Sequence, residues 1–188
     1  DEWNTRSDQN KLTTHANDRE KVVSLVDNGS IDIATVYVNT LGQLDKNMWV
    51  LSMPFLFNDH DHAARVLDGE IGAELLNGIK NSPKIQNVKG MAFTYSGGFI
   101  NVPVGKEIKS LEDFQGMKVR VSNSPVAQDT WTAIGAQAVP MDVEEVTNGL
   151  RSGAIDAGES SWPRVYPCGQ NEVAKTIFDG EHRLLLTN

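Results

Sequence analysis

The stretch LVDNGSIDIA, residues 25–34, has a counterpart in GLRSGAIDAG, residues 149–158. In each, a helical pattern ends at a glycine, Gly29 or Gly153, and an Ile-Asp pair then opens an extended segment. Glycine adopts the left-handed conformation that closes many helices, so both stretches predict a helix-to-strand connection. The repeated connection predicts an α/β fold of two similarly built lobes with a cleft between them. The alternative is a chance match, because helices commonly end in glycine before a strand.

Helical and extended patterns alternate along the rest of the chain, which predicts largely parallel sheets with helices on both faces. The segment from Met48 to Phe57 is expected to be a loop or strand, because Pro54 interrupts it. A hinge or a plain turn is expected at Ser96-Gly97-Gly98. Helices are predicted over 17–29 (capped by Asn17 and Glu20), 59–79, 110–116, 125–135 and 142–152, and strands over 31–38, 88–95, 99–104, 117–122 and directly after Asp156.

Composition limits the classes of function. With 188 residues, 39% hydrophobic and 22% charged, the chain is typical of a globular protein, and only its first 20 or so residues look poorly able to pack. The net charge of -8 argues against a nucleic-acid partner, which needs a basic face. The single cysteine, Cys168, excludes an internal disulfide. No apolar run is long enough to span a membrane. The chain opens without a signal peptide, as expected of a cytoplasmic protein or one whose leader has been removed.

Arg120 is the first candidate for a ligand contact. Apolar and polar residues alternate from Met117 to Ser122, which predicts a strand with one buried face and Arg120 on the other. The helix start at Ser124-Pro125 follows directly. An arginine there can hold a carboxylate with two parallel hydrogen bonds, and a charge-assisted bond contributes about 1.5 to 3 kcal/mol. The alternative is a solvated arginine paired with a surface glutamate.

A polar cluster follows the second connection. Glu159, Ser160 and Trp162 come at the carboxyl end of the predicted strand, where open α/β sheets bind ligands. The alternative is a tryptophan packed against its own lobe. The segment Asn58 to His62 has the residue types of a metal site, but its spacing does not suit one, so we expect no metal. No nucleophile motif, dinucleotide fingerprint or P-loop is present in the sequence, and no cofactor is expected.

Several motifs together resemble one family. In order and spacing, from about Val22 to His182, they are similar to the DctP family, the extracytoplasmic solute-binding proteins of TRAP transporters. The motifs are Pro54-Phe55-Leu56-Phe57, the run from Ser110 to Arg120, Ile134-Gly135-Ala136 with Pro140-Met141, Glu144-Glu145-Val146, and the run from Gly153 to Glu159.

The resemblance implies a two-lobed clamshell of the periplasmic-binding-protein type. Residues 1–97 would form lobe I, with 1–16 poorly ordered; 98–185 would form lobe II, and 186–188 would begin the return to lobe I. Family members usually have a further strand and helix before Val22 and a return segment after His182, so the resemblance also implies a shortened chain.

The resemblance implies a periplasmic receptor, expected to be a monomer, that captures an organic acid and delivers it to a sodium-coupled TRAP permease. The family's carboxylate-binding arginine falls on Arg120, and its polar partner, often Asn, falls on Ser160. Some family members have a second binding arginine, and this chain has Ile100 at that position. The absence of that arginine favours a monocarboxylate over a dicarboxylate. The predicted contact set comprises Arg120, Ser160, Glu159, Trp162, Phe55 and Asn123.

Two other interpretations stay open from the sequence. The chain could be a small α/β enzyme that acts on an organic acid with Glu159 as base, or a remnant that binds no ligand.

Overall fold

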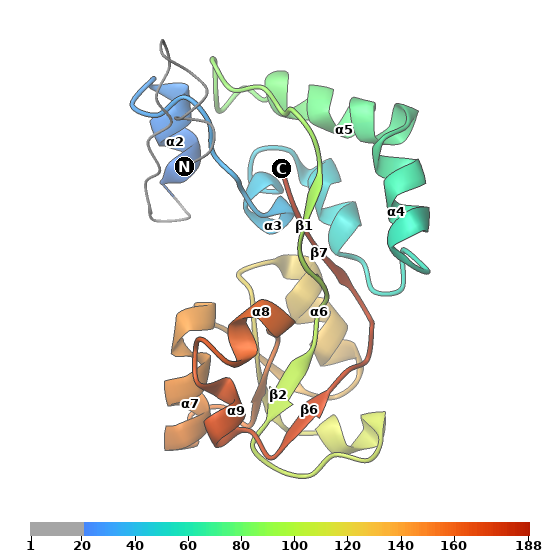
Figure 1. The fold of residues 1–188 in the computed structure, drawn as a ribbon, viewed down its shortest axis with the longest axis vertical. Coiled ribbons are helices and arrows are strands. Elements are labelled where there is room, and N and C mark those ends of the chain that lie inside the picture. Colours follow the sequence, from blue (N-terminus) through green and yellow to red (C-terminus); the bar gives the residue numbers. More distant parts are fainter. Residues whose placement is uncertain (1–20) are drawn as a thin grey trace, which may run out of the picture.

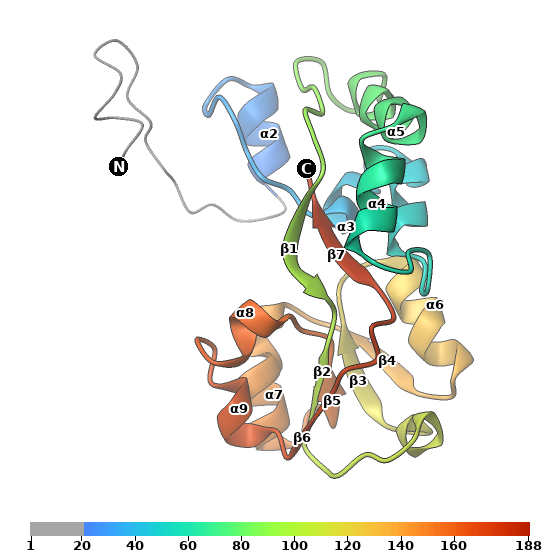
Figure 2. The ribbon, with the colours of Figure 1, turned by 45° about the vertical axis from the view of Figure 1, so that its right-hand side comes forward.

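A computed structural model describes residues 21–188 of the chain. The predicted capping pair Asn17 and Glu20 lies outside the described residues. Two bodies of the molecule are stacked along its long axis (Figure 1). The chain crosses between them where β1 continues into β2 and where β6 continues into β7 (Figure 2). The two-lobed α/β architecture predicted from the sequence is therefore confirmed.

The first lobe packs helices around a pair of antiparallel strands, β1 and β7. Its core is aliphatic, with Met48 and Ile79 fully buried and Leu184 and Leu186 contributed by β7. This lobe contains α2 (Val22–Asp27), α3 (Val38–Leu41), the 3₁₀ helix η1 (Lys46–Ser52), α4 (His60–Leu67), α5 (Glu70–Lys80), β1 (Thr94–Phe99) and β7 (Leu184–Thr187).

The second lobe is built on a five-stranded sheet of order β4-β3-β5-β2-β6. Helices α7, α8 and α9 lie on one side of this sheet and α6 on the other (Figure 2). Val119 and Phe114 are fully buried in the core, and the ring of Trp131 packs against Phe114. The elements are β2 (Val102–Val104), η2 (Leu111–Phe114), β3 (Lys118–Val121), α6 (Pro125–Ala133), β4 (Gln137–Pro140), η3 (Val143–Glu145), α7 (Val146–Ser152), β5 (Ala157–Gly158), α8 (Trp162–Val165), α9 (Gln170–Val173) and β6 (Thr176–Phe178).

Strand pairing is mixed, where largely parallel sheets were expected. The central strand β3 is parallel to β4 and β5, as predicted, whereas β2 is antiparallel to β5 and β6. The reason is the crossing between lobes: the β1–β2 segment leaves the first lobe and the β6–β7 segment returns to it, so the two must run in opposite directions. The hydrophobic pattern of a strand does not reveal which way its neighbour runs.

The repeated glycines behave as predicted, but only the second is followed by a strand. Gly29 and Gly153 both have φ of 75° and end α2 and α7. The predicted strand over 31–38 is wrong. Ile33 is 82% exposed, and only Tyr37 forms a bridge, to Thr187. Among the described residues no strand lies beside Ile31–Ala34, so the segment has no strand to pair with.

Two further elements differ from the prediction. The helix expected over 59–79 is two helices, because Gly69 is extended with φ of -95° and ψ of -164° and separates α4 from α5. The strand expected over 88–95 begins only at Thr94 and runs through Gly97 and Gly98, where positive φ angles and an irregular register mark a bulge. The segment from Met48 to Phe57 was expected to be a loop or strand. Its first part, up to Ser52, instead belongs to the 3₁₀ helix η1, and Pro54 follows that helix.

The two cores locate the crossings between lobes. Phe99 packs with the first core and Val102 belongs to the second, while Phe178 packs with the second and Leu184 belongs to the first. The boundaries at 97/98 and 185/186 stay predictions, and each crossing lies within a few residues of one of them.

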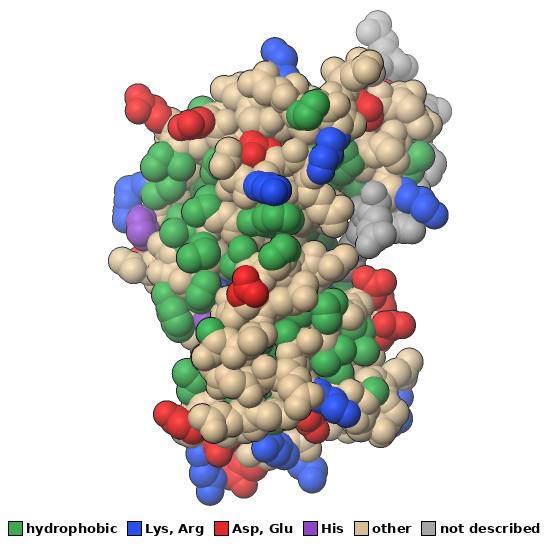
Figure 3. Space-filling model, turned by 180° about the vertical axis from the view of Figure 1, so that it is seen from behind, with side chains coloured by type: hydrophobic (Ala, Val, Ile, Leu, Met, Phe, Trp, Pro, Cys, Tyr) green, Lys and Arg blue, Asp and Glu red, His purple; other side chains and the backbone are tan. Residues whose placement is uncertain are grey.

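On the rear face, exposed hydrophobic side chains are interspersed with charged ones (Figure 3). Among the described residues no helix combines the length and hydrophobicity that a membrane span needs.

Candidate functional site

A cavity of about 450 Å³ lies between the two lobes. The first lobe contributes polar side chains from α3 and from the residues on either side of it, among them Tyr37, Asn39 and Gln43. The second lobe contributes the carboxyl ends of β3, β4 and β5, as expected for a ligand site in an α/β sheet. The residues that line the cavity from the second lobe include Arg120, Ser122, Asn123, Met141, Asp142, Glu145, Glu159, Ser160, Ser161 and Arg164.

Arg120 is buried at the floor of this cavity, with only 7% of its surface exposed. Its Nε donates a hydrogen bond to the Met141 carbonyl at 2.6 Å, and its NH1 donates to the Glu159 carbonyl at 2.9 Å. These bonds join the ends of three neighbouring segments and fix the plane of the guanidinium. The alternative of a solvated, surface-paired arginine is therefore wrong.

Arg120 keeps its charge at neutral pH. Burial lowers its pKa to about 10, and the carboxylates of Glu159, Asp142 and Glu144 oppose that shift. A rigid, protonated guanidinium that lines a cavity is well suited to bind an anion.

The Glu159 carboxylate is not available for acid–base chemistry, because three neighbouring side chains already bind it. Its Oε2 accepts from Arg183 NH2 at 2.6 Å, and its Oε1 lies 3.2 Å from His182 Nε2 and accepts from Trp131 Nε1 at 3.1 Å. Burial would raise its pKa, but Arg183, His182 and Trp131 outweigh that effect and lower the pKa to about 2. Such a weakly basic carboxylate does not serve as the general base that the enzyme interpretation requires.

Arg164 of α8 reaches across the cavity to the first lobe. Its NH1 is paired with Glu144 at 3.1 Å, and its NH2 donates to the Tyr37 hydroxyl at 3.4 Å. A second contact between the lobes joins Asn39 Nδ2 to Ser122 Oγ at 2.8 Å. The two lobes thus meet through polar side chains at the cavity wall.

The family model of a bacterial extracellular solute-binding protein, family 7 (DctP), matches residues 12–187. The chain belongs to this family. DctP proteins bind solutes and are not enzymes. The chain spans about half the length of the curated relatives it matches, since the alignments cover 48% to 49% of the first three.

Three similar proteins illustrate the range of relatives. The 2,3-diketo-L-gulonate-binding periplasmic protein of Escherichia coli is 33% identical over 164 residues, which are 87% of this chain and 48% of that protein. A TRAP periplasmic solute-binding protein of Pseudomonas putida, solved with bound D-glucuronate, is 32% identical with a TM-score of 0.81, over 89% of this chain and 54% of that one. One from Shewanella oneidensis, solved with bound succinate, is 27% identical with a TM-score of 0.78, over 89% of this chain and 53% of that one.

Four of the six predicted contact residues line the cavity of this DctP chain: Arg120, Asn123, Glu159 and Ser160. Their contact with a ligand stays a prediction. The Ser160 hydroxyl already donates to Gln170 Oε1 at 2.7 Å.

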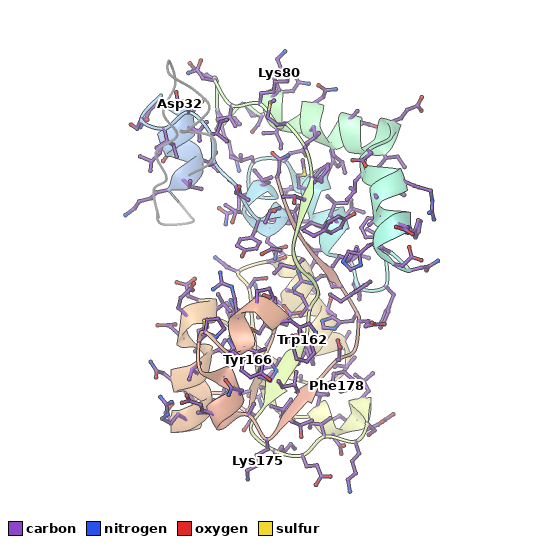
Figure 4. The ribbon with its side chains drawn as sticks, viewed as in Figure 1. Asp32, Lys80, Trp162, Tyr166, Lys175 and Phe178 are labelled. Atoms are coloured by element: carbon purple, nitrogen blue, oxygen red, sulfur yellow. The ribbon has the colours of Figure 1, made fainter. Side chains whose placement is uncertain are left out.

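Phe55 and Trp162 do not line the cavity. Phe55 is 73% exposed with φ of 58°, and its backbone N–H donates to the His182 carbonyl. Trp162 begins α8 in the second lobe and is 44% exposed (Figure 4). The segment Asn58 to His62 forms a helix start, and the part of the chain that is described contains no cluster of side chains able to hold a metal ion.

Sequence reasoning missed Arg164, His182 and Arg183. The available signal was Glu159 itself, because a carboxylate directly after a buried strand requires a cationic partner. Arg183 stands immediately before the apolar run Leu184 to Leu186, which marks it as a residue at a strand entrance.

Proposed function

We propose that this chain is the ligand-binding part of a periplasmic receptor that captures an organic acid and passes it to a TRAP-type sodium-coupled permease. The observation that carries the proposal is the buried guanidinium of Arg120, held by two backbone carbonyls at the floor of a cavity between two lobes. Family membership and relatives solved with bound glucuronate and succinate support the same class of ligand.

The proposed mechanism is capture by closure. A ligand carboxylate binds Arg120 in the second lobe, and polar groups of α3 in the first lobe, such as Asn39 and Gln43, contact the rest of the ligand. Because such a ligand touches both lobes, it stabilises the arrangement in which they meet. A monomer is sufficient for this task, and light scattering of the purified chain tests that part of the proposal.

A thermal-shift screen of sugar acids, keto acids, dicarboxylates and aromatic acids tests binding. We expect at least one acid to raise the melting temperature of the wild-type chain. Arg120→Lys keeps the charge but loses the planar fork, so it should weaken that acid about 10- to 100-fold by calorimetry. Arg151→Lys is the matched control, because Arg151 lies exposed on α7 away from the cavity.

Two outcomes would contradict the proposal. One is a folded wild-type chain that no acid stabilises, and the other is an acid that binds Arg120→Lys as tightly as it binds the wild-type chain. Circular dichroism of each variant separates loss of binding from loss of the fold. Uptake of the identified acid by membrane vesicles that contain a TRAP permease, with and without the receptor, tests delivery.

A further inference from the structure

The cavity wall directly after β5 is anchored on both of its faces. Glu159 and Ser160 are consecutive, so their side chains point to opposite sides of the extended chain. Trp131 of α6 donates to the Glu159 carboxylate at 3.1 Å, and the Ser160 hydroxyl donates to Gln170 Oε1 of α9 at 2.7 Å. The helices α6 and α9 lie on opposite sides of the sheet (Figure 2). Two buried contacts therefore fix this part of the wall from behind.

The main chain of Ser160 is fixed as well. Ser160 and Asn101 form an antiparallel bridge, in which their backbone nitrogens and oxygens are 2.8 and 3.2 Å apart. Asn101 lies on the crossing segment between β1 and β2. Residues paired in this way project their side chains to the same face, so the buried Asn101 amide lies beside the Ser160 hydroxyl.

Gln170 does not line the cavity. It begins α9, and none of its surface is exposed. Its Nε2 and both amide atoms of Asn101 form no hydrogen bond with any residue between 21 and 188. A buried polar atom without a partner lowers stability, and an apolar side chain of the same shape avoids that cost. Packing alone does not account for a glutamine here, whereas its bond to a residue of the cavity wall does.

The bond to Gln170 holds the Ser160 side chain before a ligand arrives. A serine side chain has three staggered rotamers, and ordering it on binding costs affinity. A bond made in advance selects one rotamer and removes that cost. The glutamine is itself held in place, because Thr147 Oγ1 of α7 donates to the carbonyl of Cys168, just before α9, at 2.6 Å.

We propose that Gln170 is a positioning residue for ligand capture. It contacts no ligand, and it acts by holding the Ser160 hydroxyl in the cavity wall. Asn101 already fixes the main chain of Ser160, so the side chain is what Gln170 orients. This inference rests on the proposed function, since it concerns a residue behind the same site.

Calorimetry tests whether Gln170 acts through Ser160. The probes are D-glucuronate, succinate and the acid that binds most tightly in the thermal-shift screen. Gln170→Met keeps the length of the side chain but cannot accept the serine proton. We expect it to weaken the bound acid about threefold or more, the affinity equivalent of ordering one side chain. In the Ser160→Ala background the same substitution should leave the affinity unchanged, because the hydroxyl on which Gln170 acts is gone.

Two further variants serve as controls. Gln137→Met makes the same exchange at an exposed position on β4 that does not line the cavity, and should leave the affinity unchanged. Gln170→Asn keeps the amide but shortens its reach by one methylene, so it should weaken the acid as Gln170→Met does. It replaces Gln170→Met in the cycle if circular dichroism shows that the methionine variant does not fold.

The two proposals fail in different ways. An acid that binds the Gln170 variants as tightly as the wild-type chain overturns this inference while the receptor function stands. An equal loss of affinity with and without the Ser160 hydroxyl also overturns it, because Gln170 would then act on the fold and not through Ser160. Failure of every acid to bind the wild-type chain overturns the proposed function, and this inference with it.

Discussion

Glu159 joins a tryptophan, a histidine and an arginine that lie on different segments of the chain. Replacing it by Gln keeps the shape but removes the counter-ion of Arg183, which is 5% exposed. We expect Glu159→Gln to lower the free energy of unfolding by about 3 kcal/mol, the low end of the cost of breaking a buried ion pair. Urea denaturation measures this loss. As a control, Glu172→Gln at an exposed position should change the free energy of unfolding by less than about 0.5 kcal/mol. A Glu159→Gln variant as stable as the wild-type chain would contradict the role given to the Glu159–Arg183 pair.

The same carboxylate makes stability depend on pH. The folded pKa of Glu159 is about 2, against 4.5 for an unperturbed glutamate, so the unfolded chain binds its proton first as the pH falls. The contribution of Glu159 is complete above about pH 4.5 and is lost progressively toward pH 2. Between pH 5 and pH 3 the wild-type chain should therefore lose more unfolding free energy than Glu159→Gln. Parallel curves for the two proteins would show that Glu159 is not responsible.

Individual site residues could be predicted where a local pattern marks them. Arg120 stands on a cleanly alternating strand, and Ser160 and Glu159 follow a strand end, so their sequence positions place them at the sheet edge. The position of Glu159 calls for a cationic partner, but the sequence does not identify His182 and Arg183 as that partner, because their contact with Glu159 is set by the return crossing between lobes. The exposed position of Trp162 likewise depends on how α8 sits against the sheet.

Among the elements, α5 packs closely on the end of α4. A Cβ at Gly72 would collide with the backbone carbonyl of Leu67, whereas one at Gly78 would meet only the carboxylate end of the Asp45 side chain. We expect Gly72→Ala to lose about 1 to 3 kcal/mol through overpacking. Gly78→Ala should cost less than Gly72→Ala, since alanine favours the helix and only the end of the Asp45 side chain, which accepts a hydrogen bond from the Asn47 N–H, has to move. Thermal unfolding of the pair checks this, and equal effects would contradict the close approach of α4 and α5.

Helices were easier to predict than strand partners. The second glycine connection, the capping box at Ser110 and Asp113 and the start of α6 at Pro125 are local features, and the structure has each of them. Pairing of β2 with β6 and of β1 with β7 joins segments far apart in the chain. Such pairing depends on the whole topology, which explains both the mixed sheet and the missing strand after Gly29.

At the scale of the whole molecule, the lobes are tied by hydrogen bonds across the cavity. Asn39 Nδ2 donates to Ser122 Oγ, and Asn39 also accepts from Ser52. We expect a double-mutant cycle of Asn39→Ala and Ser122→Ala to give a coupling of about 0.5 to 1.5 kcal/mol in the free energy of unfolding. Additive effects of the two substitutions would show that the lobes are not joined at this point.

The two-lobed shape itself was predictable from the alternation of elements and the family motifs, whereas the charge balance of the cavity was not. That balance follows from which arginine meets which carboxylate, and it appears only when the lobes are assembled.

The most direct test of the account is a crystal structure of the chain with a bound acid from the thermal-shift screen. We predict both carboxylate oxygens within about 2.7 to 2.9 Å of guanidinium nitrogens of Arg120, with the rest of the ligand between α3 and the segment after β4. A carboxylate held by another residue, or a ligand outside the cavity between the lobes, would contradict it.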